Sequence, residues 1–438
     1  MPPQIQLARD ADWEALQSLL SDGMNPDVVY GDGSAALHWA AYHDNLHAVQ
    51  RLIAADADVN IATDLGVTPL WLAAENGNAV IASSLLQAGA DADIALRSGE
   101  TILMTASQSG NAEVVQALLQ AGADPDVAAT RGQTALMWAA NRGHSGVVGA
   151  LLEHGANHSA TSLVRNQYVK SEKEQDSHPA YKYWIEEGGN TPLIFAARAG
   201  DLQSVKLIVG AGADTNQLSA FGTSPLIMAV HGGNAAIVEY LLEQGAEVDS
   251  DASGHTALHD AILRGNVSAV KVLLEHGADV EAKLERPTPV RRQTTDYNYH
   301  NALLGATPLW LAARFNEPAI MQMLLDHGAD PHFLNNVSYP AQRMGNYFMA
   351  EEGEISILMA AVGMGYPRLR MSWGTPERRA GQLGLSREDL AYLAAEIALM
   401  AGVELNLANA EGQTALDFAK ARRYDSVIVL LLAAGAKE

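Results

Sequence analysis

Hydrophobic residues recur along this chain in blocks of constant length. The blocks LGVTPLWLAAENGN, SGETILMTASQSGN and RGQTALMWAANRGH each join large apolar residues to small ones and end on polar residues with a glycine. A leucine pair follows the first two blocks, at Leu85 and Leu86 and at Leu118 and Leu119. Apolar residues three or four positions apart lie on one face of a helix. Each block therefore predicts a first helix, and each leucine pair predicts a second helix beside it.

The blocks repeat with a fixed period. Four of their glycines lie 33 residues apart: Gly33, Gly66, Gly99 and Gly132. The pattern recurs at five further glycines, Gly189, Gly222, Gly254, Gly305 and Gly412, of which the first and the last two follow longer gaps. A divergent unit, ISILMAAVGMG followed by LSREDLAYLAAEIALMAGVELN, precedes the last of these. Such a period indicates a solenoid, in which a unit buries its apolar surface only by stacking on its neighbours.

The units resemble the ankyrin repeat, which has a turn, TPLHxAA on a first helix and xxLLxxGAD at the end of a second. The resemblance implies an all-α fold: an ankyrin-repeat solenoid of about ten helix-turn-helix repeats with β-hairpin tips and four long insertions. Thr68 precedes Pro69, and Thr191 precedes Pro192. Each pair combines a helix-capping hydroxyl with a proline at the first helical position. The glycine of each GAD lies where the second helix ends in a left-handed residue.

The resemblance also divides the chain into repeats and insertions. The predicted segments are a capping half-repeat at 1–30, repeats 1 to 4 at 31–158, an insertion at 159–188, repeats 5 to 7 at 189–281, an insertion at 282–304, repeat 8 at 305–331, a divergent repeat 9 at 332–406 with insertions at 332–352 and 366–385, and a capping repeat 10 at 407–438. The first three insertions precede a turn, so we expect them to extend the hairpin tips on one edge. The fourth separates two helices and is expected at the opposite edge.

Several segments are similar to a bacterial family of exported, periplasmic ankyrin-repeat proteins. They are AENGNA at 74–79, RGQTALMWAA at 131–140, TPVRRQ at 288–293 and GATPLWLAARF at 305–315. Such proteins usually begin with a signal peptide, whereas MPPQIQLARDADWEAL has neither a basic nor an apolar signal region. We expect a periplasmic location if Met1 follows a removed signal peptide, and a cytoplasmic location otherwise.

Composition excludes several classes of function. The chain has no cysteine, which removes disulfides, zinc–thiolate sites, iron–sulfur clusters and cysteine nucleophiles. It has 28 Lys and Arg against 51 Asp and Glu, a formal charge of −23, which disfavours nucleic acid and anionic membrane surfaces as partners. No segment reaches the ~18 to 20 apolar residues of a membrane span. The sequence contains no catalytic motif, and we expect no cofactor and no bound metal.

The charge is divided unevenly between repeats and insertions. The insertions hold 12 of the 26 aromatic residues, 13 of the 28 basic residues and only 10 of the 51 acidic ones. They therefore carry a net +3, which leaves −26 on the repeats. Binding surfaces are enriched in Tyr, Trp and Arg, so this composition favours a binding role for the insertions. The same aromatic residues are also suited to close gaps over the scaffold.

Two groups of partner-binding residues are predicted. The resemblance implies binding by residues that follow the paired alanines of the first helices, which are Tyr42, His43, Glu75, Asn76, Gln108, Asn141, Arg142, Arg198, Arg264, Arg314 and Phe315. The insertions add aromatic residues and arginines, which are Tyr168, Tyr181, Tyr183, Trp184, Arg291, Arg292, Tyr297, Tyr299 and Tyr347. The adjacent arginines are suited to hold a carboxylate or phosphate, or equally to contact the acidic solenoid. Trp71 and Trp310 replace the usual histidine of the repeat, and we expect them to pack between layers, with a ligand box as the alternative.

The sequence therefore predicts a non-catalytic protein–protein interaction scaffold. It would bind a protein partner through the concave face and the hairpin-side insertions. The alternative is an enzyme or small-molecule binder, with a site formed where the insertions fold over the concave face. The sequence specifies neither the partner's identity nor the oligomeric state.

Overall fold

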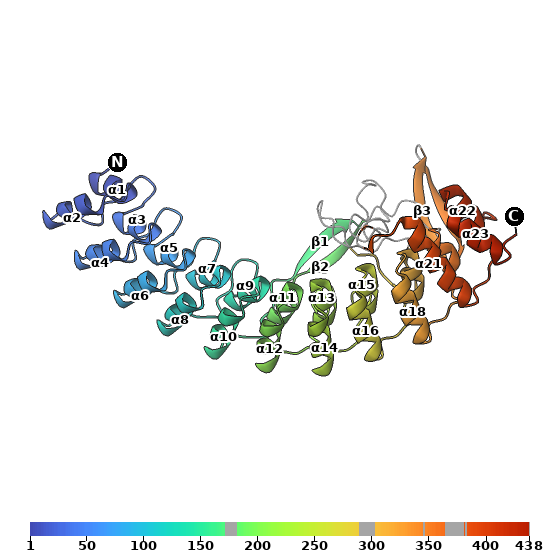
Figure 1. The fold of residues 1–438 in the computed structure, drawn as a ribbon. Helices are drawn as coiled ribbons and strands as arrows, with labels where there is room; N and C mark the ends of the chain where they lie inside the picture. The colour runs from blue at the N-terminus through green and yellow to red at the C-terminus, as the bar shows by residue number, and fades with distance from the viewer. Residues whose placement is uncertain (171–181, 289–302, 345–346, 364–380, 382, 438) are drawn as a thin grey trace. The chain divides into compact units, whose positions relative to one another are not determined.

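The computed structural model describes residues 1–438 except 171–181, 289–302, 345–346, 364–380, 382 and 438. The described residues form antiparallel helix pairs joined by short turns (Figure 1). The chain divides into two compact units, which we call unit 1 (Met1–Leu163 with Gly188–Asp214) and unit 2 (Val164–Glu187 with Thr215–Glu438). The predicted all-α repeat fold is confirmed.

Unit 1 contains six helix pairs. Their bounds are α1 Pro3–Arg9, α2 Trp13–Ser21, α3 Ala36–Tyr42, α4 Leu46–Ala54, α5 Pro69–Glu75, α6 Ala79–Gln87, α7 Ile102–Ser109, α8 Ala112–Gln120, α9 Ala135–Arg142, α10 Ser145–Glu153, α11 Pro192–Ala199 and α12 Leu202–Gly210. The first helices of the pairs contact one another in order from α1 to α11. The second helices do the same from α2 to α12. The segment that we predicted as a capping half-repeat contains a full helix pair, α1 and α2.

Unit 2 contains further helix pairs and two β-hairpins. The described helices are α13 Pro225–Gly232, α14 Ala235–Glu243, α15 Ala257–Leu263, α16 Val267–Glu275, α17 Pro308–Arg314, α18 Pro318–Asp326, α19 Ile357–Ala361, α21 Arg387–Met400, α22 Ala415–Arg422 and α23 Asp425–Ala433. The strands are β1 Arg165–Lys170, β2 Lys182–Glu187, β3 Asn335–Met344 and β4 Tyr347–Ile355. Strands β1 and β2 pair antiparallel, as do β3 and β4, whose register shifts between Pro340 and Gln342.

The helices begin and end where local chemistry requires it. The Thr68 side chain accepts a hydrogen bond from the backbone N of Trp71 at 3.3 Å, and Pro69 takes the first helical position of α5. After α6 the chain reverses at Gly89, whose φ of 94° is a left-handed conformation that favours glycine. Both features were predicted from the sequence, and both recur in other repeats.

Carboxylates at the exposed loops connect neighbouring repeats. The backbone N of Asp58 donates to Asp27 Oδ1 at 2.8 Å, and the backbone N of Asp124 donates to Asp93 Oδ1 at 2.9 Å. Hydrogen bonds to a charged acceptor are stronger than neutral ones. The carboxylates two residues after the GAD position therefore accept from the backbone of the next repeat and add polar contacts between layers that are otherwise held by apolar packing.

The two tryptophans at the histidine position pack between layers, as expected. Trp71 is 5% exposed, and Trp310 is 1% exposed. The indole Nε1 of Trp310 donates to the backbone O of Ile355 at 2.9 Å. This bond satisfies the only polar atom of the ring, so the position of Trp310 is explained by packing between repeats 8 and 9.

Candidate functional site

The residues that follow the paired alanines are mostly exposed in unit 1. Tyr42 is 56% exposed, and Gln108 is half-buried. The other members of the set are exposed: His43, Glu75, Asn76, Asn141, Arg142 and Arg198. They lie at the ends of helices that pack in consecutive order, so they form one row along unit 1. We call these eight residues the unit 1 stripe.

Aromatic rings surround the start of the stripe. The Tyr42 ring lies 5.9 Å from Trp39 and 5.3 Å from His43, in both cases edge to face. Trp13 of α2 approaches His43 at 5.9 Å, and the Arg9 guanidinium lies 5.9 Å from the centre of the Trp39 ring. Such contacts are each worth ~0.5 to 1.5 kcal/mol. The cluster therefore fixes Tyr42 while more than half of its surface stays open.

Polar side chains of the stripe also join neighbouring repeats. Asn76 Nδ2 donates to the backbone O of Tyr42 at 3.0 Å and to Asp44 Oδ1 at 3.2 Å. Arg198 Nη2 donates to Asn141 Oδ1 at 2.6 Å. The sequence reasoning missed these bonds because it treated each position separately. The available signal was a pair of complementary polar residues about one repeat apart, as at Asp44 and Asn76.

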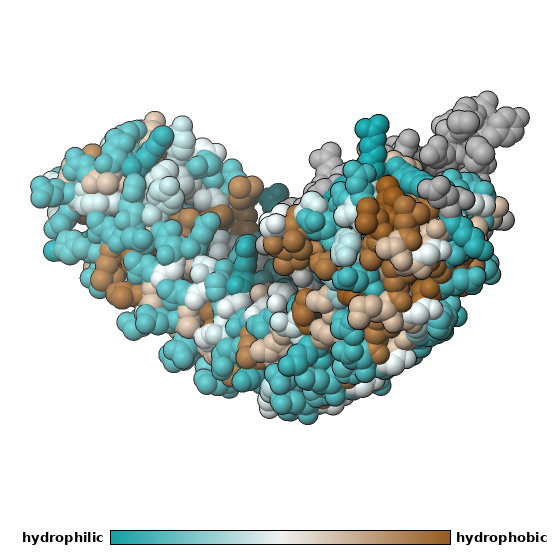
Figure 2. Space-filling view, turned by 45° about the vertical axis from the view of Figure 1, so that its right-hand side comes forward, coloured by the Kyte–Doolittle hydropathy of each residue, from teal (hydrophilic) through white to brown (hydrophobic). Residues whose placement is uncertain are grey.

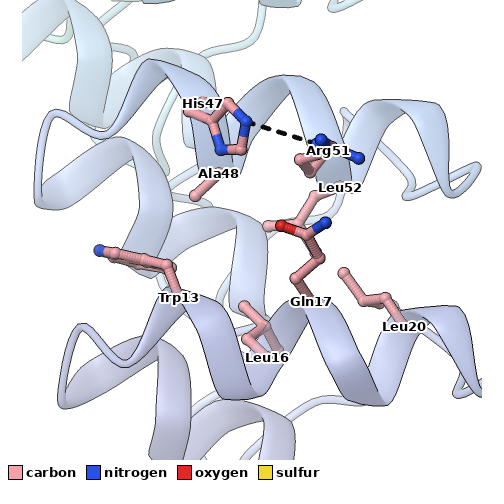
Figure 3. Close-up of a pocket in the computed structure, with 8 residues that line it drawn as sticks. All are labelled: Trp13, Leu16, Gln17, Leu20, His47, Ala48, Arg51 and Leu52. Carbon is pink, nitrogen blue, oxygen red and sulfur yellow. Dashed lines mark hydrogen bonds between the residues drawn. The ribbon is translucent and has the colours of Figure 1, made fainter.

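A small hollow lies between α2 and α4, near the start of unit 1 (Figure 3). Its lining comprises Trp13, Leu16, Gln17, Leu20, His47, Ala48, Arg51 and Leu52. The Arg51 Nε donates to His47 Nε2 at 3.5 Å across its upper edge. The hollow has room for about one water molecule, which is too little for an organic ligand. We therefore do not assign it a binding role.

The corresponding helix ends of α15 and α17 in unit 2 are largely covered. Arg314 is 7% exposed and Phe315 is 4% exposed, so their predicted contact with a partner is not supported by this burial. Every residue of α17 is buried. This helix is therefore covered on all sides. Arg264 is half-buried, and its Nε lies 2.9 Å from Asp260 Oδ2. Arg314 and Phe315 therefore differ from the unit 1 stripe in being closed to a partner.

Buried polar residues lie in the same repeat as this ion pair. Ser253 is fully buried, and its Oγ lies 3.3 Å from Nδ1 of the buried His255. His259 is also fully buried, and its Nδ1 accepts from the backbone N of Thr256 at 3.1 Å. Burial lowers the pKa of His255. Burial, with a smaller contribution from His255, lowers the pKa of His259 to about 3. Both rings are therefore neutral at pH 7.

The β1–β2 hairpin has an open face and a covered face. Tyr168 and Trp184 pair across the strands with ring centres 5.1 Å apart, and they are 53% and 68% exposed. Neighbouring residues in a strand point to the opposite face. There, Val169 and Ile185 are buried. The hairpin therefore attaches through one side and presents an aromatic pair on the other.

Tyr183 belongs to the covered face. Its hydroxyl donates to the backbone O of Pro287, in the described part of the second insertion, at 3.0 Å. Burial raises the pKa of Tyr183 to about 12. This residue thus connects two insertions within unit 2, a contact that the sequence reasoning did not predict.

Five predicted site residues lie outside the described residues: Tyr181, Arg291, Arg292, Tyr297 and Tyr299. Tyr347 is described through its backbone, which pairs with Met344 at the start of β4. A binding role for these six residues stays a prediction.

Much of the face in Figure 2 is hydrophilic, with hydrophobic residues gathered in separate clusters. Among the described residues, no group of three or more His, Asp or Glu side chains is placed to hold a metal ion. No helix in the described part of the chain has the length and apolar character needed to cross a membrane.

Family models for ankyrin repeats match more than half of the chain. A model of three consecutive ankyrin repeats matches residues 5–95, 81–162 and 178–283, and a single-repeat model matches residues 304–336. The chain therefore belongs to the ankyrin-repeat family. Ankyrin repeats generally mediate protein–protein interactions. No curated protein matches the chain in sequence.

Proposed function

We propose that this protein is a non-catalytic scaffold that binds a protein partner through the unit 1 stripe, and that the open face of the β1–β2 hairpin is a separate binding surface of unit 2. The contrast between the stripe and the buried end of α17 carries the proposal. Tyr42, Asn141 and Arg142 are exposed, whereas Arg314 and Phe315 at matching positions of unit 2 are buried. Interfaces usually change little on binding, so a binding face is expected to be open beforehand.

The chemistry of the stripe suits a protein surface. Tyr and Arg are enriched among residues that dominate binding energy. Tyr42 is held in place by its aromatic neighbours, and holding a side chain in its bound geometry reduces the entropy lost on binding. Arg142 at the end of α9 supplies an exposed positive charge on an acidic chain. We therefore expect Tyr42 and Arg142 to contribute most.

Affinity capture from the native lysate tests the stripe. The Tyr42→Ala, Arg142→Ala double variant is expected to lose the partner that the wild-type protein captures. The matched control, Gln50→Ala with Gln116→Ala, changes two exposed residues on the second helices α4 and α8. It is expected to keep the partner. If the stripe variant captures as much partner as the control, the stripe is not the binding face.

The hairpin is tested separately with the Tyr168→Thr, Trp184→Thr double variant. Threonine favours strands, so the hairpin is expected to stay folded. Circular dichroism and thermal unfolding verify this. Reduced capture would support the hairpin as part of the interface. Unchanged capture, from this variant and from one with residues 165–187 replaced by a short turn, would remove the hairpin from the proposal.

A second candidate function is binding of a small molecule within unit 2. It is supported by the buried polar groups of repeat 7, where Asp260 pairs with Arg264 at 2.9 Å and interacts electrostatically with the buried His255. A panel of metabolites in a thermal-shift assay tests this. A compound that stabilises the wild-type protein but not Asp260→Asn supports the candidate. A panel with no stabilising compound argues against it.

We also propose, from the similarity of short segments to exported ankyrin proteins, that the protein acts in the periplasm. Fractionation of native cells with an antibody against the protein tests this. Recovery in the periplasmic fraction supports the proposal, and recovery with a cytoplasmic marker refutes it.

A further inference from the structure

The open face of the β1–β2 hairpin carries a carboxylate beside its aromatic pair. Tyr168 pairs with Trp184, and the next pair on the same face is Asn166 with Glu186. All four side chains are exposed. Register places Lys170 opposite Lys182 at the following pair, toward the turn. Of the two ends of the aromatic pair, the one beside Glu186 is therefore the acidic end.

This arrangement has the chemistry of a cation site. The face of an aromatic ring carries negative electrostatic potential, and Trp is the strongest such acceptor among side chains. A carboxylate beside the ring adds a full negative charge for the same cation. A guanidinium stacks on the ring and bonds a carboxylate at once because it is planar and always charged.

The chain itself places cations over its aromatic rings in several repeats. Charged groups lie 5.5 to 5.9 Å from ring centres in these described pairs: Arg9 and Trp39, Arg286 and Phe221, Arg422 and Phe418, and Lys283 and Phe333. Trp184, by contrast, keeps 68% of its surface exposed. Its ring is thus available to a cation from another molecule.

The charge of the protein favours a basic partner. The repeats carry −26 of the formal charge against +3 on the insertions, and this charge of the repeats attracts basic segments over distances beyond direct contact. The hairpin then provides one specific binding position for a basic segment that the overall charge attracts. We propose that Trp184, together with Tyr168 and Glu186, binds an arginine or lysine side chain in a basic segment of the protein partner. This inference rests on the proposed function and specifies the partner's chemistry at the hairpin.

A structural role alone would give a different result. Aromatic pairs across two strands stabilise a hairpin without any ligand. On that account, Trp184 would show no saturable response to cationic peptides, although removing it would loosen the hairpin.

The test uses the full chain with ¹⁵N-labelled tryptophan and follows the indole N–H signal of Trp184, assigned from its loss in Trp184→Phe. The probe is the peptide Gly-Gly-Arg-Gly-Gly, and the control is the same peptide with uncharged citrulline in place of arginine. The arginine peptide is expected to shift the signal saturably and to bind at least ~3-fold more tightly than the citrulline peptide. Tyr168→Thr and Glu186→Gln are each expected to weaken binding by ~2- to 5-fold. Glu243→Gln, which makes the same charge change at an exposed position of α14, should not.

The inference is overturned if the citrulline peptide, or a proline-rich or acidic peptide of the same length, shifts Trp184 as much as the arginine peptide. It is also overturned if Glu186→Gln and Glu243→Gln behave alike. Either result leaves the proposed function intact if the Tyr168→Thr, Trp184→Thr double variant still loses partner capture. If that variant keeps full capture, it is the hairpin's part in the proposed function that fails.

Discussion

Arg264 and Asp260 form an ion pair across one turn of α15, with the Arg264 Nε 2.9 Å from Asp260 Oδ2 and both side chains largely buried. A second nitrogen of Arg264 donates to Nδ1 of His231, in the preceding repeat. The pair therefore neutralises a buried charge and connects α15 with α13. Arg264 at the end of α15 thus takes part in packing between repeats, whereas the corresponding residues of unit 1 are exposed to solvent.

Removing Asp260 is expected to destabilise unit 2. Asp260→Ala leaves the Arg264 charge buried without its carboxylate, which costs ~3 kcal/mol. Urea denaturation followed by circular dichroism measures the change. Asp251→Ala, at an exposed position of the preceding turn, is the control and is expected to stay within ~0.5 kcal/mol of wild type. A loss below ~1 kcal/mol for Asp260→Ala would contradict the role of the pair.

The buried His259 makes stability depend on pH. Its pKa is lowered from 6.5 to about 3, chiefly by burial. Between these values the unfolded chain binds a proton that the folded chain does not, so stability falls as the pH drops below 6.5 and continues to fall toward 3. In His259→Gln, this part of the pH dependence is expected to disappear, although the overall stability is lower.

Urea titrations at pH 7, 6, 5 and 4 measure the difference in slope between wild type and His259→Gln. His276→Gln changes an exposed histidine after α16 and is the control. Equal slopes for wild type and His259→Gln would show that His259 does not set the pH dependence.

The Trp310 side chain stabilises the fold through a hydrogen bond from its indole Nε1 as well as through packing. Trp310→Phe removes the donor to the backbone O of Ile355 and leaves a buried carbonyl unsatisfied, which costs ~1 to 3 kcal/mol in addition to lost packing. Trp71→Phe makes the same change at the equivalent position of repeat 2. Equilibrium unfolding of both variants is expected to show the larger loss for Trp310→Phe. A larger loss at Trp71 would refute this account.

The repeats were predictable because their determinants are local. Thr68 caps α5 through the backbone three residues ahead, and Gly89 reverses the chain directly after α6. Such features depend on residues within about one helical turn of each other, so the local amino-acid sequence specifies them. The regular spacing then places equivalent residues in neighbouring layers.

The covered helix ends of unit 2 were not predictable in this way. Arg314 and Arg198 occupy the same position in their repeats, yet the first is buried and the second is exposed. Their exposure depends on what packs over each helix, which is set by contacts between residues far apart in the sequence. Tyr183 and Trp184 likewise differ in exposure, because neighbouring residues of a strand point to opposite faces. This difference can be predicted only once the segment is known to be a strand.

Site-specific photo-crosslinking in native cells tests the central claim most directly. A photoreactive amino acid replaces Tyr42 or Arg142 in the stripe, or Gln50 on the second helix α4, and the crosslinked products are identified by mass spectrometry. The account predicts that the same partner protein is crosslinked from positions 42 and 142 and not from position 50. Crosslinking of that partner from position 50 alone, or of none from positions 42 and 142, would contradict it.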